Sequence, residues 1–348
     1  MNEIHVLKEF QATLDQLVEA DEFSGAVLVA RDQTILFQQA YGMANQSDQI
    51  PNRIDTRFNL ASMNKMFTAV AVVQLAEQGK LAFGDPVSAY LLEYPREIAE
   101  KVTIHHLLTH TSGLGWLWTK HFWNERFVEV RAHLRTVNDF LPLFRDEPLT
   151  FEPGEKFQYS NAGFVVLGSI IEHVSGQDYF TYVREHIYEP AGMHNTDAYD
   201  LDRSLPNQAI GYTHLNRNLE REAGPRRSNL FQWVVKGGPS GGGFSTVEDL
   251  FNFSLAIRSY QLLSPTFTTL LLTEKVERSD QSDAMYAYGW NNRTVNGHGI
   301  VGHSGGAWGI STHFDLYLDL GYTVVVLANY DAPIAHRIAD DLQKQLTS

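Results

Sequence analysis

The chain has 348 residues, of which 43% are hydrophobic and 20% are charged, and these proportions indicate a soluble globular protein with a sizeable core. Acidic residues outnumber basic ones by 41 to 27, and the resulting net charge of −14 disfavours nucleic acid or an anionic membrane surface as a partner. Because the chain has no cysteine, disulfides, thiolate metal sites and a cysteine nucleophile are excluded.

The first thirty residues predict a packed helix. No basic segment followed by an apolar run, as in a signal peptide, occurs there, so we expect a cytoplasmic location for the chain as given, although relatives are often exported. No run of about 18 apolar residues occurs anywhere, so no membrane span is expected. The apolar positions at helical spacing are Ile4, Leu7, Phe10, Leu14, Leu17 and Val18.

Two β-hairpins are predicted, one near each end of the chain. Residues 25–30 and 34–40 are β-rich runs on either side of a short loop. Residues 311–318 alternate in polarity, and residues 322–328 are continuously apolar, with a short turn between them. We expect these four strands to belong to one antiparallel sheet.

Two helices are expected to cover that sheet. One begins at Ser245, which opens a capping box, and the other begins at Pro333, a residue favoured at the first helical position. The middle of the chain has helical patterns interrupted by proline and glycine, with no obvious strand pairs. We therefore predict an α/β sheet domain from residues 1–84 and 240–348, with residues 85–239 as an inserted, mainly helical domain.

Ser62 and Lys65 are the leading chemical candidates. They begin a segment that is apolar nearly all round until Gly79, which is typical of a buried central helix. Residues three apart share a helix face, so the Lys65 amine can accept or relay the proton of the Ser62 hydroxyl. This Ser-x-x-Lys spacing occurs once, whereas composition alone predicts about 0.5 occurrences. The spacing is therefore informative mainly because it stands at the start of an apolar helical segment. The alternative is a lysine that reaches the surface.

Two further segments complete a pattern, namely Phe157 to Asn161 and Gly302 to Gly306. With them the chain resembles the serine β-lactamase and penicillin-binding protein superfamily, in its class C, D-alanyl-D-alanine peptidase and esterase branch. That superfamily combines Ser-x-x-Lys, Tyr-x-Asn and a third motif of Lys or His, then Ser or Thr, then Gly. The resemblance implies a β-lactamase/transpeptidase-like fold of the α/β (α+β) class, an antiparallel sheet flanked by helices. Residues 107–114, 153–155, 189–193 and 242–246 extend it over most of the chain.

The resemblance also implies roles for individual residues. Ser62 is the nucleophile, and the backbone N–H groups of Ser62 and Gly306 form the oxyanion hole. A tyrosine base requires the Lys65 charge to stabilise its phenolate, whereas a lysine base requires desolvation, so the identity of the base stays open. No cofactor or metal is expected. The catalytic residues are Ser62, Lys65 and Tyr159, and the substrate-binding or oxyanion residues are Asn161, His303, Ser304, Gly305 and Gly306.

The third motif has His303 where many β-lactamases have a lysine. A histidine is largely neutral at physiological pH, so we expect less reliance on a substrate carboxylate. The predicted function is therefore a serine hydrolase for small esters or D-amino-acid peptides and amides. The alternatives are a true β-lactamase and a penicillin-binding sensor with little turnover, although the complete set of motifs favours turnover. The physiological substrate, hydrolysis against acyl transfer, and the oligomeric state stay open.

Three further groups of residues each have two interpretations. His106 and His110, with His105 nearby, have the i, i+4 spacing of a metal site, but no nearby glutamate completes the pattern. Arg226 and Arg227 could supply positive charge to the site, but a pair of arginines in a polar stretch is more often a solvated surface. An aromatic group forms either an apolar wall for the acyl group or part of the core: Trp116, Trp118, Phe122 and Trp123.

Overall fold

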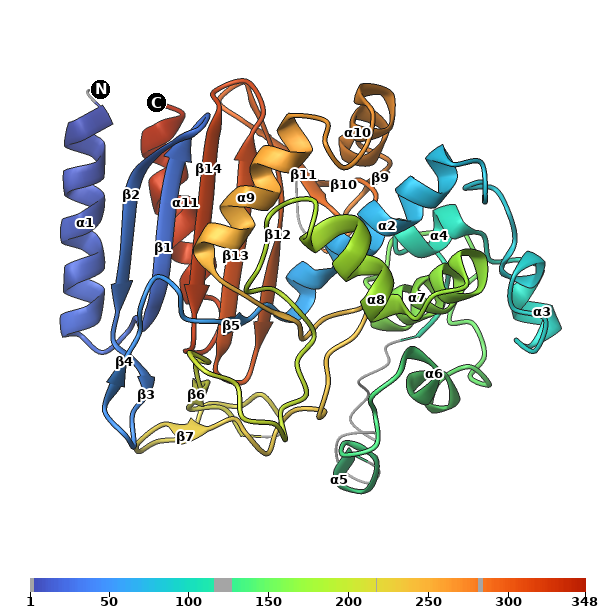
Figure 1. The fold of residues 1–348 in the computed structure, drawn as a ribbon, viewed down its shortest axis with the longest axis horizontal. Helices are drawn as coiled ribbons and strands as arrows, with labels where there is room; N and C mark the ends of the chain where they lie inside the picture. The colour runs from blue at the N-terminus through green and yellow to red at the C-terminus, as the bar shows by residue number, and fades with distance from the viewer. Residues whose placement is uncertain (1–2, 116–126, 217, 281–283) are drawn as a thin grey trace.

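The computed structural model describes residues 3–115, 127–216, 218–280 and 284–348. Within them, an eight-stranded sheet has the order β2-β1-β14-β13-β12-β11-β10-β9, and all its neighbouring strands are antiparallel (Figure 1). Both predicted hairpins are confirmed. The strands of these hairpins are β1 (Gly25–Arg31), β2 (Thr34–Tyr41), β13 (Ile310–Tyr317) and β14 (Tyr322–Ala328).

The other half of the sheet continues from β13. The long strand β12 (His298–Ala307) carries the third motif and pairs with β13 and with β11 (Asn291–Val295). The sheet ends with β10 (Met285–Tyr286) and β9 (Val276–Glu277). Three further pairs of short strands are β3 (Met43–Asn45) with β4 (Ile50–Pro51), β5 (Phe58–Asn59) with β8 (Phe244–Ser245), and β6 (Tyr212–Thr213) with β7 (Arg227–Ser228).

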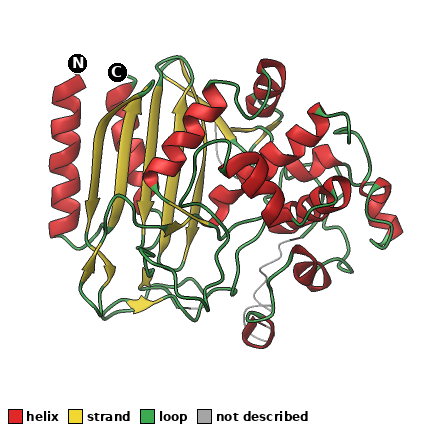
Figure 2. Ribbon diagram, viewed as in Figure 1, coloured by secondary structure: helices red, strands yellow, loops and turns green. Residues whose placement is uncertain are grey.

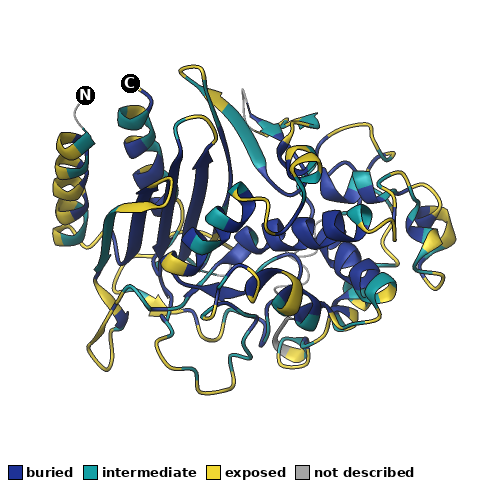
Figure 3. Ribbon diagram, turned by 45° about the horizontal axis from the view of Figure 1, so that its top comes forward, coloured by how far each residue is buried: buried dark blue, intermediate teal, exposed yellow. Residues whose placement is uncertain are grey.

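Helices cover both faces of the sheet. On one face, α1 (Glu3–Glu19) and α11 (Ile334–Leu346) pack against alternate residues of β1 and β14, including Val27 and Val326. On the other face, α9 (Val247–Arg258) and α2 (Lys65–Glu77) share a core with the intervening residues, such as Leu28. The central strands are therefore buried on both sides, whereas α1 is largely exposed on its outer side (Figure 3). The predicted class, an antiparallel sheet flanked by helices, is confirmed.

A helical region lies beside the sheet, around α2 (Figure 2). Its division from the sheet as an inserted domain over residues 85–239 stays a prediction. Contrary to the expectation for this stretch, β6 and β7 form a strand pair, which residue patterns miss because each strand has only two residues. The helices are α3 (Arg96–Ala99), α4 (Ile104–Leu108), α5 (Phe127–Val130), α6 (Val137–Phe140), α7 (Asn161–Ser175) and α8 (Tyr179–Val183), and α10 (Pro265–Leu272) follows later in the chain.

Two helix starts differ from the prediction by one residue. The hydroxyl of Thr246, and not that of Ser245, caps α9 by accepting a hydrogen bond from the Asp249 N–H at 3.1 Å. Ser245 belongs to β8, and its hydroxyl lies 2.7 Å from that of Thr196. Pro333 is the residue before α11 and not its first residue. No helix among the described residues is long and apolar enough to span a membrane.

Candidate active site

Ser62 lies in a tight turn between β5 and α2. The turn is a 3-10 helix over Ala61–Asn64. Ser62 therefore precedes the α-helix, whereas the sequence predicts it in the first turn of that helix. Ala61 has a φ of +45°, a left-handed conformation that is costly for alanine and that occurs preferentially at functional sites. The Asn59 Oδ1 atom holds it by accepting the Ala61 N–H at 2.9 Å. Ser62 is partly exposed, whereas Ala61 and Met63 on either side of it are buried.

A glycine-rich segment, residues 237–243, packs against this turn. The Gly242 N–H donates to the Ala61 carbonyl at 3.1 Å. A Cβ atom on Gly241 would lie only 2.8 Å from the same oxygen, so a larger residue would displace the turn. Sequence reasoning assigned no role to this segment, because its partner lies about 180 positions away in the chain. Its glycines are the one signal that indicates close backbone contact.

Lys65 is fully buried, which excludes the alternative of a lysine that reaches the surface. Its Nζ atom donates to the Asn161 Oδ1 atom at 2.7 Å and to the Ser240 carbonyl at 2.5 Å. Burial holds the pKa of the Lys65 amine well below its usual range. A neutral amine has two N–H groups, which these two acceptors satisfy, and its remaining lone pair is available for a proton.

Asn161 and Tyr159 reach the site from the start of α7. The Ser160 hydroxyl caps this helix by accepting the Gly163 N–H at 3.2 Å, which fixes the residues on either side of it. The Lys65 Nζ atom lies 4.7 Å from the centre of the Tyr159 ring. Burial raises the pKa of Tyr159, and a hydrogen bond with the Ser62 side chain acts in the opposite direction. Tyr159 and Asn161 of the second motif thus lie beside Ser62 and Lys65 of the first motif.

Strand β12 brings the third motif to the same turn. A Cβ atom on Gly305 would lie 2.2 Å from the Leu60 carbonyl, so only glycine allows this approach. Gly306 is exposed, as an oxyanion-hole donor requires, and Ser304 is partly exposed. The structure therefore brings the third motif to residues 60–61, whereas the roles of Ser304, Gly305 and Gly306 stay predictions.

His303 is buried, with 4% of its surface exposed. Its Nε2 atom lies 3.1 Å from the Tyr286 hydroxyl, and its Nδ1 atom lies 2.6 Å from the Ser304 carbonyl. Burial lowers the pKa of His303 to about 3, so the ring is neutral at physiological pH. Both of its nitrogens thus have partners within the protein, and the role of His303 in substrate binding stays a prediction.

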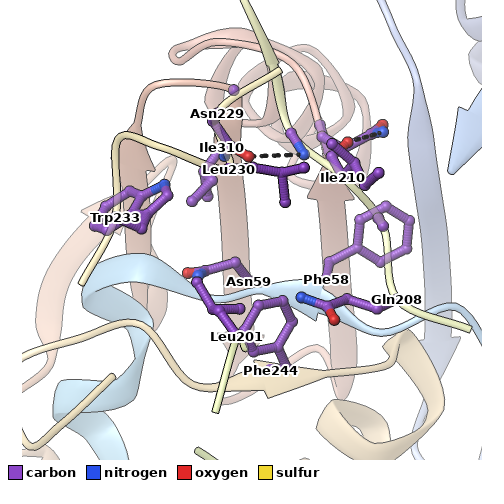
Figure 4. A pocket seen from close by; sticks show the side chains of 15 residues that line it. Phe58, Asn59, Leu201, Gln208, Ile210, Asn229, Leu230, Trp233, Phe244 and Ile310 are labelled. Carbon is purple, nitrogen blue, oxygen red and sulfur yellow. Dashed lines mark hydrogen bonds between the residues drawn. The ribbon is translucent and has the colours of Figure 1, made fainter. Parts of the chain in front are cut away.

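Cavities lined by described residues lie near these elements. One, of about 20 Å³, is lined by Phe58, Asn59, Trp233 and other mostly apolar side chains (Figure 4). It has room for roughly one water molecule, so it is a packing defect and not a substrate site. The other, of about 600 Å³, extends from Ser304 and its neighbours in the third motif to His336 on α11. Its size is that of small-molecule sites.

The secondary candidates have other partners. His105 and His106 engage Tyr288 and the Thr103 N–H respectively, and the described residues contain no group of three or more potential metal ligands. Arg226 binds Asp21, as expected for a residue outside the site. The proposed aromatic wall of Trp116, Trp118, Phe122 and Trp123 lies outside the described residues.

The fold, together with a partly exposed serine and a tyrosine ring beside a buried lysine, defines a serine hydrolase. Residues 10–348 match the family model described as Beta-lactamase, and the chain belongs to the β-lactamase family. The predicted superfamily and fold are thereby confirmed.

Three similar proteins illustrate the family. A penicillin-binding protein of Bacillus subtilis (strain 168) is 33% identical over 337 residues, which are 92% of this chain and 71% of the relative. Esterase EstB of Burkholderia gladioli is 38% identical over 192 residues, which are 52% of this chain and 49% of the relative. The solved structure of a penicillin binding protein from Bacillus halodurans has a TM-score of 0.85 at 35% identity, and the match covers 95% of this chain and 98% of that one.

Proposed function

We propose that this protein hydrolyses small esters or D-amino-acid amides and peptides through an acyl-enzyme on Ser62. The observation that carries the proposal is the buried Lys65 amine, which Asn161 holds at 2.7 Å and which lies 4.7 Å from the centre of the Tyr159 ring, one helical turn from Ser62. A serine hydroxyl is a weak nucleophile unless a neighbouring group takes its proton. The Lys65 amine and the Tyr159 phenol are the two candidates for taking the proton, and both lie beside Ser62.

Lys65 is the better candidate for the general base. Burial acts on the two groups in the direction of their neutral forms, an uncharged Lys65 amine and a protonated Tyr159 phenol. Of these two forms, the amine has the more basic lone pair. Tyr159, which contacts Ser62, would then pass the proton between the Ser62 hydroxyl and Lys65 and back to the leaving group.

The reaction has two balanced steps. In the first, a bond forms between the Ser62 Oγ atom and the substrate carbonyl carbon, the bond to the alcohol or amine breaks, and the leaving group takes the serine proton. In the second, water attacks the acyl group with the same two side chains, and Ser62 regains its proton. In both steps the N–H groups of Ser62 and Gly306 would stabilise the negative oxygen.

The substrate class follows from His303. Because burial and internal hydrogen bonds keep its ring neutral, it does not supply the positive charge that a β-lactam carboxylate would meet. The similarity to esterase EstB supports the same class. Small acyl donors without a carboxylate next to the scissile bond are therefore the preferred substrates.

A substrate panel tests this proposal. We expect short-chain aryl esters and a D-alanyl anilide to have a kcat/KM at least about tenfold above that of a chromogenic cephalosporin. Faster turnover of the cephalosporin would identify a true β-lactamase and overturn the proposal. Stable acylation by penicillin without turnover of any ester or amide would instead favour a penicillin-binding sensor.

A further inference from the structure

Two buried residues outside the assigned site connect to His303 through hydrogen bonds. The Tyr286 hydroxyl, on β10, lies 3.1 Å from the His303 Nε2 atom and 3.1 Å from the His110 Nε2 atom. The other His110 nitrogen, Nδ1, accepts the Ser160 N–H at 3.1 Å. His110 and Tyr286 are both at most 1% exposed, so water does not compete for these contacts.

His303, Tyr286 and His110 form a row of hydrogen-bonded side chains, and the donor of each bond in this row can be deduced in turn. Since a backbone N–H can only donate, the His110 Nδ1 atom carries no proton, and the proton of the neutral ring is on Nε2. That N–H donates to the Tyr286 oxygen, so the one hydroxyl proton of Tyr286 is directed to the His303 Nε2 atom. The His303 proton must then be on Nδ1, where it donates to the Ser304 carbonyl at 2.6 Å. One backbone donor thus determines the tautomer of both histidines.

We propose that Tyr286 and His110 are positioning residues, which hold His303 as a neutral ring with its proton on Nδ1. Through Tyr286 and His110, His303 on the third motif strand is connected to the backbone of Ser160. Ser160 caps α7 and lies between Tyr159 and Asn161 of the second motif. The neutral His303 ring would explain why substrates without a carboxylate are preferred, and this part of the inference rests on the proposed function.

Backbone strain at His110 supports a dedicated role. Its φ is +58°, in the left-handed region, which is unfavourable for histidine and persists only where the surroundings hold the residue. Both ring nitrogens are held, and the ring lies on Tyr159 with 4.3 Å between the ring centres. His110 therefore orients the proton-transfer tyrosine by direct ring contact as well as orienting His303 through Tyr286.

The charges around the row favour neutral rings. Burial lowers the pKa of both histidines, and the nearby Arg278 acts on each in the same direction. Arg278 does not supply a substrate-binding cation, because its guanidinium binds the Asp280 carboxylate at 2.8 Å and the Asn291 side chain at 2.5 Å. The guanidinium of Arg278 thus has an internal role.

The tautomers are measured by long-range ¹H–¹⁵N NMR of protein labelled at histidine, with signals assigned by their loss in H303N and H110N. We expect His303 to be neutral with its proton on Nδ1, and His110 neutral with its proton on Nε2, from pH 5 to pH 8. Titration of His303 near pH 6.5, or a proton on its Nε2 atom, would overturn the proposal. Because this measurement needs no turnover and applies equally to S62A, it can fail independently of the proposed function.

Tyr286→Phe tests the link itself, with Tyr288→Phe as its matched control. Tyr288 lies two residues further on, and its hydroxyl also bonds a histidine, His105, at 3.0 Å, but outside the site. We expect that in Y286F the His303 proton is no longer confined to Nδ1 and is found on Nε2 as well. The kcat for an aryl ester should fall about 10- to 100-fold with little change in KM. Y288F should leave both readouts unchanged. An unchanged His303 tautomer in folded Y286F would contradict the proposal, and if Y286F does not fold, the parent tautomers decide.

Discussion

The Lys65 Nζ atom lies 4.7 Å from the centre of the Tyr159 ring, and burial shifts the pKa values of the two groups in opposite directions. The pKa of the lysine falls and that of the tyrosine rises, so both groups favour their uncharged forms. An uncharged amine beside a protonated phenol is a resting state that can accept the serine proton.

Lys65→Met should change how stability depends on pH. The folded-state pKa of Lys65 lies below its unfolded value near 10.5, so between the two values the unfolded chain binds the extra proton, and the parent gains stability as pH rises. In urea unfolding at pH 7, 8 and 9, the free energy of unfolding of the parent should rise relative to K65M by up to about 1.4 kcal/mol per pH unit. Parallel pH profiles would indicate an ordinary lysine.

Tyr159→Phe should impair catalysis more than binding. It removes the hydroxyl that contacts Ser62 and leaves the ring on His110 and Lys65 in place. We expect kcat for an aryl ester to fall by about 10² to 10⁴, with KM changed little. A Y159F enzyme with parental kcat would exclude Tyr159 from proton transfer.

Gly305→Ala should disrupt the approach of β12 to the nucleophile turn. The added Cβ would lie 2.2 Å from the Leu60 carbonyl, so backbone must move, at a cost of about 1–3 kcal/mol in stability. We expect kcat/KM to fall about 100-fold. Gly299→Ala in the same strand is the control, because its Cβ would meet only Leu318 at 3.8 Å. Equal effects of G305A and G299A would refute the close approach.

His303 should make the protein less stable in acid. Its folded-state pKa is about 3, so between about pH 6.5 and pH 3 the unfolded chain binds a proton that the folded chain does not, and stability falls as the pH falls. In urea unfolding at pH 7, 6 and 5, His303→Gln should remove up to about 1.4 kcal/mol per pH unit of this loss. An acid slope equal to that of the parent would show that His303 is protonated in the folded state.

The sequence predicts much of the fold and the site, and the exceptions have physical reasons. The strands of the two hairpins are long enough for their periodicity to appear, whereas β6 and β7 are not. Ser62, Lys65, Tyr159 and Asn161 belong to local motifs whose spacing is visible in the chain.

Other parts of the site depend on contacts between distant segments. His110 and Tyr286 are 176 residues apart, and only the tertiary packing of residues 105–110 beside residues 286–289 brings them together. The strained conformation of Ala61 is equally hidden, because alanine gives no local indication of a positive φ. Tertiary contacts, and not residue types, therefore decide both features.

Intact-mass spectrometry of protein quenched during turnover tests acylation at Ser62 most directly. With an aryl ester, the parent should gain the mass of one acyl group, and peptide mapping should locate this group on Ser62. Ser62→Ala should show no adduct and at least about a 10³-fold lower kcat. Undiminished turnover in S62A, or an adduct on another residue, would contradict the central claim.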